Sequence, residues 1–146
     1  MAKKFKFRLE SILNIKYIKE DKIKTELGNL YSEEKKILNK IDFIESQIII
    51  IENEIKSMSN FTIQEYKENH FYLSNLKQQK ADVKISLKKI KKKIDATKER
   101  LVKAMKERKV LEALKENKKE EYKKEENLKM QKIMDELGIT RFKKDA

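Results

Sequence analysis

The sequence predicts an all-α protein of two long helices that form an antiparallel coiled-coil hairpin, with helix 2 longer than helix 1 and overhanging it. Of the 146 residues 42% are charged, none is Pro and only two are Gly. The turns that a sheet domain needs would therefore have almost no residues to form them. Apolar residues instead recur every 3.5 residues in two long runs, which is the pattern of a coiled-coil seam. One short polar segment separates the two runs.

The first run predicts a helix over about residues 9–58. Steps of four and three residues from Leu9 to Met58 visit fifteen positions, of which twelve are apolar. A surface helix packed on a globular core would drift off this register within a few turns. The seam positions are Leu9, Leu13, Lys16, Glu20, Ile23, Leu27, Leu30, Glu34, Ile37, Ile41, Ile44, Ile48, Ile51, Ile55 and Met58.

A short loop at about residues 59–61 follows, and its sequence marks the start of the next helix. Thr62 and Glu65 have the spacing of a capping box, and Phe61 and Tyr66 occupy the positions of a hydrophobic staple around it. Helix 2 is therefore expected to begin at Thr62. A loop this short makes the two helices antiparallel neighbours.

The second helix is predicted over about residues 62–137, with 138–146 as a tail. Ten of its fourteen seam positions are apolar, and polar ones are expected to help fix the register. Folding about Phe61 pairs positions whose numbers sum to about 122, so everything after Leu114 is expected to overhang. Gly138 is the expected C-cap. The seam positions are Tyr66, Asn69, Leu73, Leu76, Lys80, Val83, Leu87, Ile90, Ile94, Thr97, Leu101, Ala104, Arg108 and Leu111.

Enzyme function is disfavoured by the residues that the chain lacks. Two glycines 110 residues apart exclude a phosphate-binding loop, and His70 is the only histidine in a chain without cysteine. Neither a metal site nor a catalytic triad is expected from these residues. A single seam also leaves no enclosed pocket for a substrate. We therefore expect no enzyme activity, no cofactor and no small-molecule substrate.

The net charge of +12 is concentrated in one segment. Residues Lys77–Val110 hold twelve Lys, two Arg and four acids, a balance of +10. The segment is either a solvated face that keeps the chain soluble or a binding surface for nucleic acid or another anionic partner. Few Arg and no aromatic residues disfavour base recognition. A homo-oligomeric structural coiled coil is a third interpretation.

Two groups of apolar residues lie off the seam and are candidate binding surfaces. Near the hairpin tip, Phe43 and Ile50 share an outward face of helix 1, and Phe71 and Tyr72 lie on helix 2. Scattered surface apolar residues are the alternative explanation. In the N-terminal stretch, either the apolar segment 128–137 or a partner is expected to cover three isoleucines, which are Ile12, Ile15 and Ile18.

Both ends of the chain resemble one family. The opening Phe5–Leu13 segment, and a closing Glu125–Leu137 segment in which Glu-Asn is followed by Gln-Lys and then Asp-Glu, are similar to the termini of the FliJ family of flagellar export proteins. The resemblance implies a soluble component of the flagellar type III export apparatus. Its location would be cytoplasmic and peripheral at the inner membrane, since no segment is long and apolar enough to span a bilayer and the N-terminus lacks a signal peptide.

The resemblance also implies partners. Family members resemble the stalk of rotary ATPases, with the end that carries both termini inserted into the export ATPase hexamer. That end has Leu128, Gln131, Lys132, Asp135 and Glu136, together with Ile12, Ile15 and Ile18. The export gate's cytoplasmic domain would contact the tip, at Phe43, Ile50, Phe71, Tyr72 and Leu76. Export chaperones are further expected partners, and an equivalent stalk of a related injectisome is the alternative.

Overall fold

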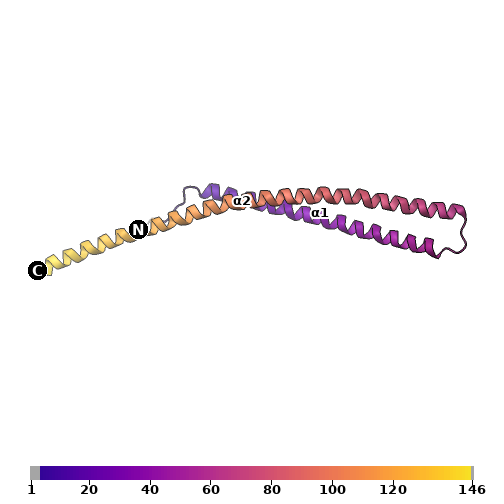
Figure 1. Ribbon diagram of the computed structural model, residues 1–146. Coiled ribbons are helices and arrows are strands. Elements are labelled where there is room, and N and C mark those ends of the chain that lie inside the picture. Colours follow the sequence, from indigo (N-terminus) through magenta and orange to yellow (C-terminus); the bar gives the residue numbers. More distant parts are fainter. Residues whose placement is uncertain (1–3, 146) are drawn as a thin grey trace. The chain divides into compact units, whose positions relative to one another are not determined.

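The computed structural model describes residues 4–145 and contains two α-helices (Figure 1). Helix α1 spans Glu10–Ser57 and helix α2 spans Ile63–Asp145, so the predicted all-α class with a longer second helix is confirmed. Contacts divide the chain into two compact units. Unit 1 consists of the residues up to Asp21 and those from Val102 onward, and unit 2 is Lys22–Leu101. The assignment of residues 1–146 to one domain stays a prediction.

Unit 2 is a helical hairpin with an apolar seam. The later part of α1 and the first part of α2 run antiparallel and are joined by residues 58–62 (Figure 1). Every buried residue of this unit occupies a position that the 3.5-residue repeat assigns to the seam. The coiled-coil register is therefore confirmed here. A continuous apolar cluster in this seam consists of Ile41, Ile44, Ile48, Ile51, Leu73, Leu76 and Val83.

The start of α2 has the capping interactions that the sequence predicts. The backbone N–H of Glu65 donates to Thr62 Oγ1 at 3.1 Å, and the Phe61 and Tyr66 rings stack with centroids 5.5 Å apart. The hydroxyl satisfies one of the N–H groups that a helix start leaves unpaired. The ring pair fixes the angle at which the chain enters the helix.

Unit 1 has far less apolar interior. Its described residues bury only two apolar side chains, Leu13 and Ala104, each 2% exposed. The third buried side chain is the carboxylate of Glu20, which is 3% exposed. All three are seam positions, so the register continues in unit 1 while its chemistry changes from apolar to polar.

The helix pairing is close to the expected one. The residue numbers of cross-helix ion pairs sum to 123 for Lys16–Glu107, 125 for Lys80–Glu45 and 129 for Lys77–Glu52, against an expected value of about 122. The interleaving of seam side chains fixes the register, and the loop adapts to it.

Helix α2 extends past the start of α1 as predicted, but the expectation that everything after Leu114 overhangs is wrong for residues 115–122. Residues 4–9 are not helical, and this N-terminal segment lies along α2, with the Phe5 ring centroid 5.7 Å from that of Tyr122. Lys115 is paired with Glu10 at 2.8 Å. A heptad pattern has no means of placing a non-helical segment, and for this reason the sequence predicted too long an overhang.

The predicted end of helix 2 at residue 137 is wrong as well, because α2 continues to Asp145. Gly138 lies inside the helix, and no glycine in the described residues has the positive φ of an αL cap. One glycine costs a helix about 1 kcal/mol and does not end it unless another signal, such as a following proline, supports the stop. Of the predicted tail, Ala146 lies outside the described residues.

Candidate protein-binding surfaces

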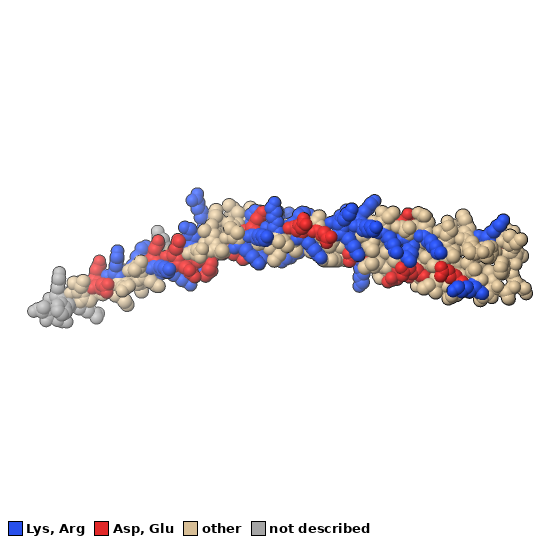
Figure 2. Space-filling view, viewed as in Figure 1, with Lys and Arg blue, Asp and Glu red and all other residues tan. Residues whose placement is uncertain are grey.

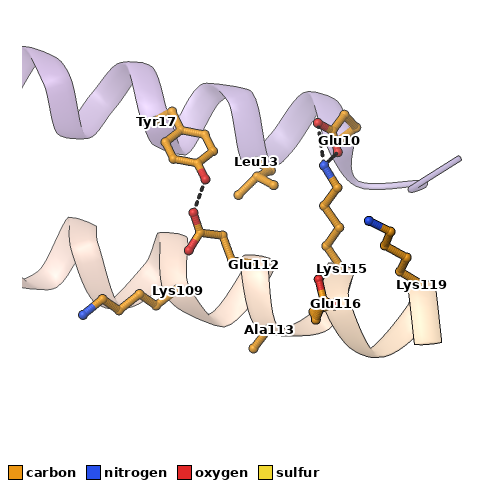
Figure 3. A pocket seen from close by; sticks show the side chains of 9 residues that line it. All are labelled: Glu10, Leu13, Tyr17, Lys109, Glu112, Ala113, Lys115, Glu116 and Lys119. Atoms are coloured by element: carbon orange, nitrogen blue, oxygen red, sulfur yellow. Dashed lines mark hydrogen bonds and ion pairs between the residues drawn. The ribbon is translucent and has the colours of Figure 1, made fainter. Parts of the chain in front are cut away.

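A network of charged side chains connects the two helices in unit 1. We call Lys16, Tyr17, Glu20, Glu107, Arg108 and Glu112 the polar seam cluster. The guanidinium of Arg108 donates from Nε to Glu20 and from Nη1 to both carboxylate oxygens of Glu112 at 2.9 Å. It also lies 5.5 Å from the centroid of the Tyr17 ring, and the Tyr17 hydroxyl donates to Glu112 (Figure 3). Three groups thus fix one guanidinium at a seam position.

These contacts shift the pKa values of the cluster. The hydrogen bond from Lys16, at 3.1 Å, lowers the pKa of the Glu107 carboxyl, and the hydrogen bond from Tyr17 lowers that of Glu112. The bond to Glu112 raises the pKa of the Tyr17 phenol. The bonds to Glu20 and Glu112 raise the pKa of Arg108 further above the physiological range. Every shift favours the protonation state already present at neutral pH, so the cluster holds the helices together and is not poised for proton transfer.

Beside the cluster, unit 1 has an apolar groove between the N-terminal segment and α2. Its volume is about 570 Å³, and Phe5, Phe7 and Leu9 face Leu114 and Tyr122 across it. The Tyr122 hydroxyl is buried without a hydrogen-bond partner among the described residues. Sequence reasoning missed this groove. The off-seam aromatic pair Phe5 and Phe7 was the available signal for it.

The part of α2 beyond this groove is uncovered. All residues from 127 to 139 are exposed. Leu128, Gln131 and Asp135 have helical spacings of three and seven residues and share one face with Lys132. A different face bears an apolar stripe with the same spacings, formed by Met130, Ile133, Met134 and Leu137.

The three N-terminal isoleucines are exposed too. Ile12 is 44% exposed, Ile15 61% and Ile18 55%. The apolar segment 128–137 does not cover them, since its own large apolar side chains are all more than half exposed. The segment 128–137 and a partner were the two expected covers. Covering by a partner therefore stays a prediction.

Near the turn of unit 2, the structure brings together part of the predicted tip patch. Phe43 and Tyr72, both exposed, line one groove of about 310 Å³ together with Gln47, Asn75 and Gln79. Leu76 belongs to the floor of this groove and to the seam, and at 6% exposed it offers a partner almost no surface. Ile50 and Phe71 are exposed but do not line the groove. The polar lining was missed because glutamine and asparagine give no periodic signal.

The described residues contain no group of three potential metal ligands. No helix in this part of the chain has an apolar stretch long enough to cross a membrane. His70 is exposed near the turn, with its ring packed on Tyr66 at 4.2 Å. What the surface does offer is open grooves and uncovered helix faces, which are features of partner recognition.

Two long helices that pair through a heptad seam place the chain in the class of coiled-coil hairpin proteins. Within this class the family is clear, because the model of the family described as flagellar FliJ protein matches residues 5–146. The chain belongs to that family and is a component of the flagellar export machinery. No curated protein and no solved structure matches the chain.

Proposed function

We propose that this chain is a non-catalytic adaptor that binds the hexameric export ATPase through unit 1 and the cytoplasmic domain of the export gate through unit 2. It promotes assembly of the ATPase ring or ATP hydrolysis in trans, and export chaperones are its further partners. It works in the cytoplasm, at the inner face of the inner membrane. Grooves on the described surface are open rather than enclosed, which supports a binding role over a catalytic one.

The observation that carries the proposal is the uncovered segment of α2. From 127 to 139 every residue is exposed, and the two faces differ in chemistry. Four large apolar side chains on one face lose contact with water only when a partner covers them. The opposite face carries Gln131 and Asp135, side chains that give hydrogen bonds with defined geometry. A helix that enters a ring of subunits meets protein on several sides, and both faces then have a use.

The rate of ATP hydrolysis by the export ATPase tests the role of unit 1. The rate is measured for the flagellar export ATPase of the same organism, with and without the full chain, at physiological salt. We expect stimulation that disappears when the chain ends at Lys124. The paired change Gln131→Ala with Asp135→Ala should weaken stimulation, while Lys119→Ala with Lys123→Ala on the same helix leaves it intact. Full stimulation by the truncated chain would refute the assignment of this segment.

Binding of the export gate tests the role of unit 2. Phe43→Ala with Tyr72→Ala removes the aromatic walls of the groove, and we expect it to weaken binding of the gate's cytoplasmic domain in a titration. Phe71→Ala with Ile50→Ala tests the two predicted residues outside the groove. Ile49→Ala is the control, because Ile49 is 57% exposed and does not line the groove. Equal loss of helicity in the groove variant would make its residues structural instead.

A further inference from the structure

One helical stretch of α2 in unit 2 carries a high density of positive charge. Between residues 84 and 93 six of ten side chains are lysines and none is acidic. We call them the lysine face; its members are Lys84, Lys88, Lys89, Lys91, Lys92 and Lys93. All six are exposed, whereas the apolar side chains of Val83, Ile90 and Ile94 point into the seam. Figure 2 shows basic side chains gathered along this part of α2.

Three other cations of unit 2 are paired across the two helices. Arg100 is paired with Glu26 at 3.0 Å, Lys80 with Glu45 at 3.2 Å and Lys77 with Glu52 at 3.9 Å. None of the six lysines of the lysine face is in an ion pair among the described residues. Like charges three and four residues apart on one helix repel each other and destabilise it. An anionic partner would remove this repulsion.

An apolar side chain at the centre of the lysine face identifies the kind of anion. Ile85 is 54% exposed, and Lys88, Lys89 and Lys92 follow it by three, four and seven residues, so all four share one surface of the helix. An aliphatic side chain makes no favourable contact with the phosphates of nucleic acid. The lysine face also lacks the arginines and aromatic rings that contact bases. A bilayer interface can bind both kinds of side chain, because lysines contact the anionic headgroups and an aliphatic side chain inserts below them.

We propose that the lysine face of α2, centred on Ile85, binds the anionic phospholipid headgroups of a membrane surface. Clusters of four to eight basic residues on a helix are enough for such binding, and each lysine near the surface strengthens it about fivefold. The surface is separate from the ATPase-binding and gate-binding residues proposed above, so this inference does not depend on them.

Flotation of the full-length chain with lipid vesicles tests the proposal. We expect binding to vesicles of phosphatidylglycerol mixed with phosphatidylcholine, none to pure phosphatidylcholine, and weakening as salt is raised. Lys88→Gln with Lys89→Gln and Lys92→Gln should lower the partition by about a hundredfold. The matched control, Lys119→Gln with Lys123→Gln and Lys124→Gln, removes the same charge elsewhere on α2 and should retain most of the binding. All six positions are exposed, so far-UV circular dichroism should be unchanged in both variants.

The variant Ile85→Gln distinguishes binding to a membrane from binding to other polyanions. It keeps every lysine, and we expect it to weaken vesicle binding while leaving any binding to duplex DNA unchanged. Two results would overturn the proposal. In the first, the control variant loses as much vesicle binding as the lysine-face variant, so that only total charge matters. In the second, Ile85→Gln has no effect on vesicles and duplex DNA competes the chain off them.

Discussion

The two units use the same heptad register with opposite chemistry. Unit 2 holds ten of the twelve buried apolar side chains in the described residues, all of them aliphatic, and Thr97 is its one buried polar side chain in this part of the chain. Unit 1 holds the other two and replaces the aliphatic contacts by the polar seam cluster around Arg108. Apolar burial is non-directional and insensitive to pH, while ion pairs at a seam fix the register and depend on charge. Apolar burial thus stabilises unit 2, and charged contacts align the helices of unit 1.

The largest effect is expected from a cavity in unit 2. Ile44→Ala removes a side chain that is 4% exposed within the main apolar cluster, and should lower the free energy of unfolding by about 2–5 kcal/mol. Urea unfolding followed by circular dichroism measures it. Ile49→Ala on the same helix removes an exposed isoleucine and should change stability by less than about 0.5 kcal/mol. Equal losses would mean that burial in this seam does not determine stability.

A smaller, local effect is expected in unit 1. Glu20→Ala leaves the Arg108 guanidinium without the partner at which its Nε points, and breaking a buried pair on one side is destabilising. Hydrogen exchange should accelerate about tenfold or more at residues 10–21 and 102–115, with unit 2 unchanged. Replacing both partners by Leu should restore protection, because an apolar pair of similar size removes the unpaired charge. Acceleration spread evenly over both units would contradict a division of the molecule into two parts.

Acid should loosen unit 1 before unit 2. Glu107 and Glu112 have pKa values lowered below the ordinary 4.5, so their contribution to stability is complete above that value and is lost as the pH falls through the lowered pKa. Unit 2 relies on apolar burial, so amide NMR spectra followed from neutral pH into acid should show unit 1 losing its native signals at a higher pH than unit 2. Lys16→Met removes the main cause of the Glu107 shift and should move the transition of that carboxyl toward its ordinary pKa. Simultaneous loss of both units would contradict the prediction.

At high pH the polar seam cluster is expected to lose a different contribution to stability, that of Tyr17. The pKa of Tyr17 is raised above 10.0 by its bond to Glu112, so this contribution is present below that value and disappears as the pH rises through the raised pKa. In unit 2 the bond to Tyr31 raises the pKa of Lys98, so its contribution to stability is likewise lost only as the pH rises through the raised pKa. At neutral pH both contributions are present.

The seam was predictable from the sequence because a 3.5-residue period is a global constraint. All fourteen buried residues in the described part of the chain occupy positions that the repeat assigns. The sequence also offers a seam residue of opposite charge to pair with Arg108, which is Glu20. The exposed apolar residues at the tip and at residues 12–18 were also located correctly, apart from Leu76, although their binding partners stay predictions.

What the sequence could not give depends on forces without periodicity. The packing of Phe5 against Tyr122 joins a non-helical segment to a helix far along the chain, and no local pattern encodes that contact. Likewise, the groove at Phe43 and Tyr72 depends on the axial offset between the helices, which seam side chains set only after they interlock.

The smallest effects come from the two glycines, one in each unit, and they sharpen the comparison further. An added Cβ meets nothing within 4 Å at either Gly28 or Gly138. Gly28→Ala, inside the paired part of α1, should therefore raise the free energy of unfolding by about 0.5–1 kcal/mol, because alanine loses less backbone entropy on folding. Gly138→Ala should increase helicity in circular dichroism yet leave the urea midpoint unchanged. All side chains from 127 to 139 are exposed, so order gained in this segment is not coupled to the seam. A raised midpoint in the second variant would show that the uncovered end of α2 folds together with the paired helices.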